Sequence, residues 1–278
     1  MELNNIRIAI LGAGNIGGAI AKGLAESKVI PVDRIMLTRR KKEGLESFDR
    51  MGFATTCENG RAVKGADMVF IGVTPQQLNP LLDDIKDAID EQTHTVVSLV
   101  SGVTIAEIRR HLNSSVPLIR AMPNTAIAIR ESMTCLAADS DLQDRMTLVK
   151  GIFDALGRTL IISEELMVPA TALCACGTAF FLRAVRAASQ GGIEIGFHAE
   201  EALFMAAQTA LGAASLLIRP GNHPEREVDK VTTPQGCTIS GLNQMEHSGF
   251  SSALIKGIVT SADKARLLYN PKRETPDA

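Results

Sequence analysis

A glycine-rich turn near the amino end of the chain constrains the fold more than any other feature. An apolar run at residues 6–11 leads directly into Gly12-Ala-Gly14-Asn-Ile-Gly17, and a helical pattern then covers residues 16–27. Such a turn presents backbone N–H groups at a helix N-terminus, where they can bind phosphates. The pattern alone is weak, because glycine-rich turns occur in other α/β folds. In this strand–turn–helix setting it predicts a βαβ unit that binds a dinucleotide.

The alternation of strand and helix patterns continues up to residue 163. Further strands are expected at residues 34–38, 68–73, 95–100, 118–121 and 158–162, with helices between them such as 105–112 and 141–156. Continuous apolar strands separated by helices are typical of a parallel sheet covered on both faces. We therefore predict an α/β Rossmann-like NAD(P)-binding domain over residues 1–163.

After residue 163 the strand patterns stop. Helices are expected at residues 165–188, 200–218, 234–247 and 251–268, with breaks at 191–192, 219–224 and 248–249. This predicts an all-helical domain over residues 164–270. The 165–188 helix is apolar on nearly every side, so we expect a second copy of the chain to cover it. The polar tail 271–278 is expected to be disordered.

Composition excludes several classes of protein. A net charge of −2 and the absence of Trp give no basis for nucleic-acid binding. The five scattered Cys are typical of reduced thiols in a cytoplasmic protein, and Cys174 and Cys176 are expected to be small packing residues and not a metal site. No signal peptide is visible, and no apolar run is expected to approach the length that spans a bilayer.

The end of the second strand indicates which dinucleotide is bound. The glycine turn, with the residues Gly12, Gly14, Asn15, Ile16 and Gly17, is expected to hold the pyrophosphate. An NAD enzyme usually has Asp or Glu at the end of that strand, whereas this chain has Thr38-Arg39. Because Arg39 can bind a 2′-phosphate with two hydrogen bonds, NADPH is expected in preference to NADH. A solvated basic turn is the alternative, so NADH stays possible.

Three further residues are expected beside the cofactor. Thr74 and Pro75 follow the strand 68–73, and Ser101 follows the strand 95–100. In parallel α/β sheets, cofactor and substrate meet at the carboxyl ends of the strands. These residues are therefore expected to line that edge.

A second anion site is expected at the start of a helix in residues 232–246. Thr233 can cap the helix, and Pro234 suits the first turn. The N–H groups of Gly236, Cys237 and Thr238 would then point at a carboxylate or a phosphate. An ordinary capped surface helix is the alternative interpretation.

No general base stands out in the sequence. The five His lie at turns and helix ends, outside any acid–base cluster. Oxidation of an alcohol needs such a base, whereas reduction of a protonated C=N bond mainly needs the substrate and the nicotinamide to be held in line. The pattern therefore favours an imine reductase.

Together these motifs resemble the pyrroline-5-carboxylate reductase family. The resemblance rests on the motifs at residues 12–17, 98–104, 120–125, 223–224 and 232–246. It implies reduction of 1-pyrroline-5-carboxylate to L-proline with NADPH or NADH, the last step of proline synthesis. It also implies a Rossmann-like domain followed by a helical domain that interleaves into a homodimer, with further assembly into decamers open.

The resemblance also implies roles for individual residues. The backbone of Gly236, Cys237 and Thr238 would hold the substrate carboxylate, and Thr238 would contact the ring nitrogen. Asn59 and Asn124 would contact the cofactor.

Among the residues that depart from the family pattern are Thr74, Cys174, Cys176 and Gln235. They stand where the family commonly has lysine, serine, serine and glycine. A reductase for another small imine or keto-carboxylate therefore stays open, as does a non-catalytic NADP-binding paralogue.

Overall fold

The computed structural model describes residues 3–138, 142–219 and 221–269. The chain divides into two compact units. The first comprises the chain up to Cys176 together with the stretch from Ser261, and the second is Gly177–Thr260. The domain boundary between residues 163 and 164 stays a prediction, and the tail 271–278 lies outside the described residues.

The first unit is built on an eight-stranded sheet with the order β3-β2-β1-β4-β5-β6-β7-β8. The strands are β1 (Ile8–Leu11), β2 (Ile35–Thr38), β3 (Ala54–Thr56), β4 (Met68–Ile71), β5 (Thr95–Ser98), β6 (Leu118–Met122), β7 (Ser132–Ala137) and β8 (Gly157–Ile161). Strands β1 to β6 are parallel, β7 runs antiparallel to β6, and β8 is parallel to β7. The strand order reverses beside β1, which makes the end of β1 the point where such sheets bind ligands.

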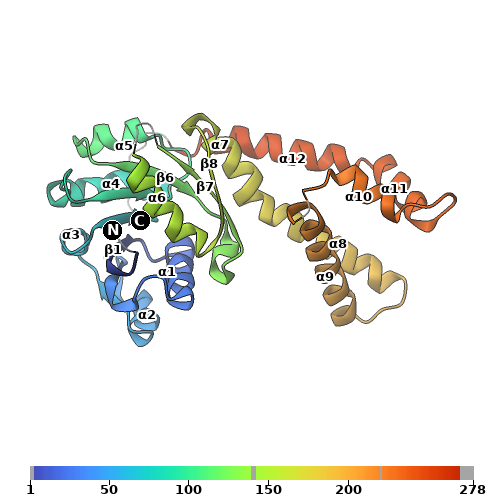
Figure 1. Ribbon diagram of the computed structural model, residues 1–278, viewed down its shortest axis with the longest axis horizontal. Helices are drawn as coiled ribbons and strands as arrows, with labels where there is room; N and C mark the ends of the chain where they lie inside the picture. The colour runs from blue at the N-terminus through green and yellow to red at the C-terminus, as the bar shows by residue number, and fades with distance from the viewer. Residues whose placement is uncertain (1–2, 139–141, 220, 270–278) are drawn as a thin grey trace. The chain divides into compact units, whose positions relative to one another are not determined.

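Helices cover both faces of this sheet (Figure 1). Side chains of α1 (Asn15–Ser27), α2 (Glu46–Arg50) and α6 (Gln143–Asp154) form the core on one face. Side chains of α3 (Asn59–Lys64), α4 (Pro75–Ile85) and α5 (Ile105–Leu112) form it on the other. Strand β1 contributes Ile8 and Ile10 to the first core and Ala9 and Leu11 to the second, as expected for a strand buried on both faces. The predicted Rossmann-like architecture is confirmed.

Two strands were not predicted. Strand β3 has three residues, too few for a periodic pattern. Strand β7 runs antiparallel to β6, so the predicted parallel sheet contains one antiparallel strand pair. Its side chains are nevertheless mostly buried, because helices lie over it.

The second unit is helical. It contains α8 (Gly177–Glu194), α9 (Ala199–Ile218), α10 (Pro224–Val231), α11 (Cys237–His247) and most of α12 (Phe250–Ala265). The predicted break at residues 191–192 is wrong, since α8 continues through both glycines. A Cβ on Gly192 would lie 3.0 Å from the Cβ of Ala202, so this glycine serves the close approach of α8 and α9.

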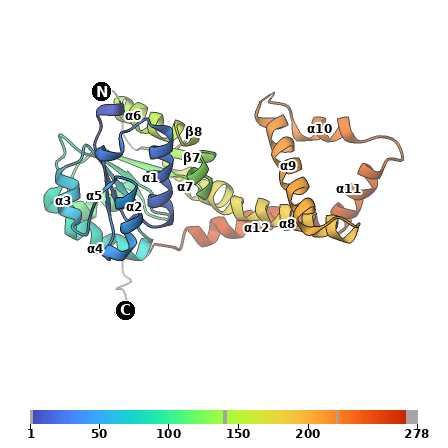
Figure 2. The ribbon, with the colours of Figure 1, turned by 90° about the horizontal axis from the view of Figure 1, so that it is seen from below.

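Helix α10 falls partly where a break was predicted. His223 caps its N-terminus by accepting a hydrogen bond from the Glu225 N–H, and Pro224 occupies the first turn. Figure 2 shows it as a separate helix between α9 and α11. Pro224 therefore starts a helix, although it was expected to lie in a loop.

The segment before α8 is not the single regular helix predicted for residues 165–188. It begins with a 3₁₀ turn at Glu164–Leu166, continues as α7 (Met167–Ala170), and then widens into a π-helix at Thr171–Cys176. Met167 and Ala170 pack against Met122, Cys135 and Ala137 of the sheet. A π-helix changes which residues share a face, so it alters the direction in which Cys174 points.

Much of the apolar surface of the helices is exposed in the single chain. Two helical stretches, Glu164–Glu194 and Ala199–Ile218, are long and apolar enough to cross a bilayer by length and composition. Each stretch contains an apolar window of 18 residues, and 28% and 6% of these windows are buried. The expectation that no segment approaches that length is therefore wrong. Length and composition alone are weak evidence for a membrane, because helices that pack against a second chain share them.

Candidate active site

The turn after β1 has the geometry that a dinucleotide site requires. Gly12 has φ +98°, and a Cβ there would lie 2.8 Å from the Gly72 carbonyl oxygen. A Cβ on Gly17 would collide with the Gly12 carbonyl. No atom lies within 4 Å of the Cβ position of Gly14, so the backbone there is open to a ligand. Helix α1 then starts at Asn15 with Gly14 as its N-cap and no side-chain cap, which leaves the first N–H groups for phosphate oxygens.

The end of β2 holds this turn in place. The N–H groups of Gly12 and Ala13 donate to the Thr38 carbonyl at 3.2 and 2.9 Å. The Thr38 hydroxyl donates to Asn59 Oδ1 at 2.6 Å, and Asn59 Nδ2 donates to Asp84 Oδ2 at 2.9 Å. The turn, β2 and the start of α3 are thus joined by one chain of hydrogen bonds.

Asn59 also lies in a cleft. The cleft has a volume of about 670 Å³ and is lined by Cys57, Glu58, Asn59, Gly60, Arg61, Lys64 and Asp84. It opens beside the strand end that carries Thr38, where the adenosine half of a dinucleotide binds in this type of sheet. Asn59 stays a predicted cofactor contact, and the cleft supplies the space for one.

Arg39 follows Thr38 at the carboxyl end of β2. Its Nη1 donates to the Gly44 carbonyl at 3.2 Å, which folds the side chain over the turn at Lys42–Gly44. A guanidinium has five N–H donors, so this contact leaves donors for a phosphate. The side chain is exposed, and Glu43 is the acidic residue of that turn.

The other predicted cofactor residues lie after the strands at the same sheet edge. Thr74 is the N-cap of α4 and Pro75 its first residue. The Ser101 hydroxyl contacts the Met122 sulfur at 3.9 Å. Asn124 is held on three sides: its N–H donates to the Ser132 hydroxyl, its Oδ1 accepts from the Ala126 N–H, and its Nδ2 donates to the Cys174 carbonyl. Asn124 therefore has a structural role in addition to the predicted one.

The second anion site differs from its prediction in detail. Helix α11 starts at Cys237 with Gly236 as its N-cap, so Thr233 does not cap it and Pro234 precedes it. Residues 233–236 form a turn in which the Gly236 N–H donates to the Thr233 carbonyl at 2.9 Å. The Gly236 N–H was expected to point at an anion, but it is used within the turn instead. The N–H groups of Cys237 and Thr238 lie in the first turn of α11, which no side chain caps.

Gln235 occupies the left-handed region in this turn, with φ +59°. This conformation costs a non-glycine residue roughly 1–2 kcal/mol, which explains why glycine suits the position. The turn is kept in this chain despite that cost. The predicted cofactor residues belong to the first unit and Thr233, Gly236, Cys237 and Thr238 to the second.

A buried ion pair beside the sheet was not predicted. Arg120 lies in the middle of β6, is 2% exposed, and donates from Nη1 to Glu164 Oε1 at 3.3 Å. The same oxygen accepts the N–H of Ile105 at 2.6 Å. Burial lowers the pKa of Arg120, and the Glu164 carboxylate opposes that shift. The signal in the sequence was a basic residue inside an otherwise apolar strand.

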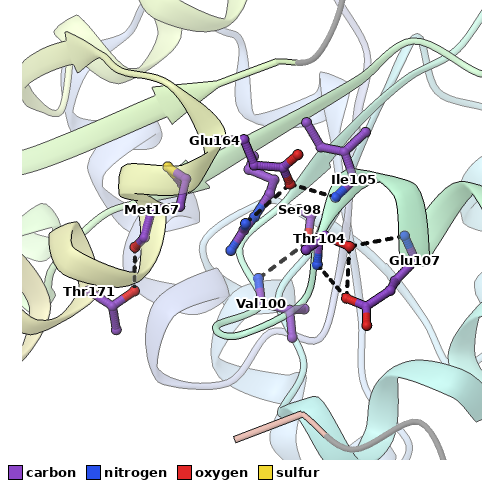
Figure 3. A network of polar contacts seen from close by, with 9 residues as sticks. Ser98, Val100, Thr104, Ile105, Glu107, Glu164, Met167 and Thr171 are labelled. Atoms are coloured by element: carbon purple, nitrogen blue, oxygen red, sulfur yellow. Dashed lines mark hydrogen bonds and ion pairs between the residues drawn. The ribbon is translucent and has the colours of Figure 1, made fainter. Parts of the chain in front are cut away.

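This ion pair adjoins the start of α5. Thr104 and Glu107 form a capping box there, so the loop after β5 is fixed by side chains from both sides (Figure 3). At the start of the same loop, the Val100 N–H donates to the hydroxyl of Ser98, the last residue of β5, at 3.4 Å. Because the Ile105 N–H at the end of this loop donates to Glu164, the loop that carries Ser101 is joined to the segment that begins at Glu164.

Within the described residues, no group of three or more His, Cys, Asp and Glu side chains is placed to hold a metal ion. The groups described above are hydroxyls, side-chain amides and backbone N–H groups. These are groups that bind and orient a cofactor and an anionic substrate.

Comparisons with known proteins agree with this architecture. Residues 164–268 match the model of the pyrroline-5-carboxylate reductase dimerisation family, and residues 7–102 match that of the coenzyme F420-dependent NADP oxidoreductases. A structure of a pyrroline-5-carboxylate reductase from Coxiella burnetii superimposes with a TM-score of 0.87 at 28% identity, covering 96% of this chain and all of that one. A Plasmodium falciparum pyrroline carboxylate reductase with NADP bound has a TM-score of 0.88 at 20% identity, which shows the shared fold.

Two relatives from Dictyostelium discoideum show closer similarity. Pyrroline-5-carboxylate reductase 1 is 54% identical over 99% of this chain, although the chain spans only about half, 52%, of that protein's length. Pyrroline-5-carboxylate reductase 2 is 48% identical over 94% of this chain and 93% of its own length. The similarity thus includes both the glycine turn and the segment around Thr238, and the chain belongs to the pyrroline-5-carboxylate reductase family.

Proposed function

We propose that this chain reduces 1-pyrroline-5-carboxylate to L-proline with NADPH, the last step of proline biosynthesis. One observation carries the proposal: the 48% identity to a pyrroline-5-carboxylate reductase extends over 93% of that protein, and so takes in both predicted sites. The open backbone at Gly14 and the uncapped starts of α1 and α11 fit a dinucleotide and a small carboxylate.

Each predicted residue has a task in this proposal. The turn of Gly12, Gly14, Asn15, Ile16 and Gly17 holds the pyrophosphate, and Thr38, Arg39 and Asn59 hold the adenosine end. Thr74, Pro75, Ser101 and Asn124 line the nicotinamide end. NADPH supplies the hydride for the C=N bond. Arg39 favours NADPH over NADH because it meets the 2′-phosphate with a positive charge.

The substrate is assigned to the turn before α11. The N–H groups of Cys237 and Thr238 bind the carboxylate, and Thr233 and Gly236 shape the turn that presents them. The Thr238 hydroxyl hydrogen-bonds the ring nitrogen. It orients the imine and is not a general base, because the cationic C=N bond already accepts hydride readily.

We also propose that the chain is a cytoplasmic homodimer. Exposed apolar side chains on α8 and α9, among them Phe181, Leu182, Phe204 and Leu211, are a surface that a second copy would cover. This accounts for the two apolar helical stretches without a membrane. A stable monomer at micromolar concentration in analytical ultracentrifugation would contradict the dimer, and the same experiment distinguishes a dimer from a decamer.

The test of the activity is the oxidation of NADPH on adding pyrroline-5-carboxylate, repeated with NADH and with a panel of other cyclic imines and keto acids. Proline formation with a lower KM for NADPH than for NADH is expected. Turnover only with another substrate would favour a reductase of different specificity, for which Thr74 in place of the family's lysine is the motivating change. Binding of NADPH without turnover of any substrate would indicate a non-catalytic paralogue.

A further inference from the structure

Strand β6 makes two side-chain contacts that bear on the loop after β5, residues 99–104. Arg120 Nη1 donates to Glu164 Oε1 at 3.3 Å. Two residues further along the strand, the Met122 sulfur accepts the Ser101 hydroxyl at 3.9 Å. The first contact reaches the loop through Glu164, and the second reaches it directly.

The Arg120 guanidinium depends on Glu164 for the compensation of its charge. Its side chain is almost fully buried. In the part of the chain that the structure describes, its Nε and Nη2 are buried and have no hydrogen-bond partner. A buried ion pair adds little net stability compared with apolar side chains of similar size, but removal of one partner is costly because a buried charge is then left alone. The pair therefore does less to stabilise the fold than to hold the Glu164 carboxylate in one place.

The carboxylate in turn holds the end of the loop 99–104. Glu164 Oε1 accepts the N–H of Ile105, the first residue of α5, at 2.6 Å, although the two residues lie 59 positions apart in the chain (Figure 3). Within the loop, Gly102 has φ +80°, and a Cβ there would lie 3.0 Å from the Ala265 carbonyl oxygen. The loop is thus closely packed on one side and bonded at its end to Glu164.

We propose that Arg120 and Glu164 are positioning residues for the nicotinamide end of the cofactor. Arg120 fixes the Glu164 carboxylate, and the carboxylate fixes the Ile105 N–H. The loop 99–104, with Ser101, is thereby held at the carboxyl end of β5, where cofactor and substrate meet in such sheets. Neither charged side chain touches the cofactor; both act through the loop. This inference rests on the proposed function, which assigns Ser101 to the nicotinamide end.

The test compares the binding of two ligands to the full chain. NADPH has both ends of the cofactor, whereas adenosine 2′,5′-bisphosphate has the adenosine end alone. Glu164→Ala should raise the Kd for NADPH about fivefold and leave the Kd for the bisphosphate within about twofold of the parent value, measured by calorimetric titration. Equal losses for the two ligands would indicate a general loss of structure and overturn the proposal, as would an unchanged affinity for NADPH.

Two further variants separate the hydrogen bond from the charge. Glu164→Gln keeps an oxygen that can accept from both donors, so it should recover most of the NADPH affinity lost in Glu164→Ala. The double variant Arg120→Met/Glu164→Ala removes the buried charge together with the acceptor, so it should fold even where Glu164→Ala does not. It should still bind NADPH more weakly than the parent. A double variant with the parent's affinity for NADPH would refute the role of the pair.

The matched control is Glu165→Ala, which removes an exposed carboxylate next to Glu164. It should bind both ligands as the parent does. A loss of NADPH affinity in Glu165→Ala equal to that in Glu164→Ala would show that the charge of this segment, and not the bond to Ile105, is responsible, and would contradict the proposal.

Turnover is the second readout. With pyrroline-5-carboxylate, kcat of Glu164→Ala should fall roughly tenfold, because small displacements of positioning groups slow the transfer of hydride. The KM for pyrroline-5-carboxylate should change little, since the substrate is assigned to the turn before α11. A lower Tm with parental kcat and Kd would mean that the pair only stabilises the fold, which would overturn the proposal. If the parent has no such activity, the proposed function fails, while the comparison of the two ligands still decides the positioning role.

Discussion

The Thr38 hydroxyl donates a 2.6 Å hydrogen bond to Asn59 Oδ1 and thereby joins the end of β2 to the start of α3. The same residue holds the glycine turn through its carbonyl. The glycine turn and the start of α3, both expected to contact the cofactor, are thus fixed by the backbone and the side chain of Thr38. The position of Asn59 relative to the turn depends on a hydroxyl that valine lacks.

Thr38→Val should therefore weaken the binding of NADPH. A hydrogen bond of this kind contributes ~1 kcal/mol, so the Kd is expected to rise about fivefold. Titration of NADPH by fluorescence measures it. Thr55→Val on β3 is the matched control, since it removes a 2.6 Å bond to Asp49 away from the turn. Equal effects of the two variants would contradict the role given to Thr38.

Arg39→Gln should change the choice of cofactor. A hydrogen bond to a charged group is worth ~1.5–3 kcal/mol, so the KM for NADPH is expected to rise about tenfold or more. The KM for NADH should change little, because NADH has no 2′-phosphate. Steady-state kinetics with both cofactors measures the ratio. Arg50→Gln in the last turn of α2 makes the same change of charge elsewhere and should leave the ratio as it is.

Thr238→Ala should lower kcat roughly ten- to hundredfold, as expected for the loss of a hydrogen bond to a charged imine. NADPH affinity should stay near that of the parent, because the cofactor residues belong to the other unit. Ser251→Ala is the control, since its hydroxyl bonds to Glu246 and not to the turn at residues 233–236. Unchanged turnover in Thr238→Ala would sink the assignment of this residue.

His94 should make the stability of the fold depend on pH. It is buried, its Nδ1 accepts the Asp90 N–H, and burial lowers its pKa from 6.5. The unfolded chain therefore takes up this proton at a higher pH than the folded chain does. Above pH 6.5, neutral His94 does not reduce the free energy of unfolding. Below pH 6.5 the free energy of unfolding decreases as the pH falls, by at most about 1.4 kcal/mol per pH unit for one proton.

Urea unfolding at pH 7, 6 and 5 measures this dependence. His94→Gln should flatten the decrease, and His247→Gln, at an exposed position, should not. A parent protein with equal unfolding free energies at pH 7 and pH 5 would rule out this role for His94.

The parts of the fold that local chemistry determines were predictable from the sequence. Gly12 is required in part by its own positive φ, and Gly17 by the neighbouring Gly12 carbonyl, so the local pattern was enough to locate the turn. Helix α5 was placed with the bounds it has, because its capping box is local. Strands β1, β2, β4, β5 and β6 were found because strands buried on both faces appear in the sequence as continuous apolar runs.

The parts that depend on distant contacts were not predictable. In the sequence Gly192 resembles a helix break, and only its close contact with Ala202 on α9 explains a glycine inside α8. The π-helix Thr171–Cys176 depends on how this segment packs against the sheet. At the candidate site, the left-handed backbone of Gln235 could not be predicted. The surrounding turn imposes this conformation, whereas glutamine rarely adopts it.

The end of the described chain returns to the first unit. The Tyr269 hydroxyl donates to Asn79 on α4 at 2.9 Å, and a Cβ on Gly102 would lie 3.0 Å from the Ala265 carbonyl oxygen. In connectivity the helical unit is therefore an insertion, entered at Gly177 and left after Thr260. A single cleavage of the backbone cannot release the first unit intact, because Tyr269, which packs against its core, follows the last described strand by more than a hundred residues. During synthesis, the packing of the first unit is completed only after the residues of the helical unit have been made.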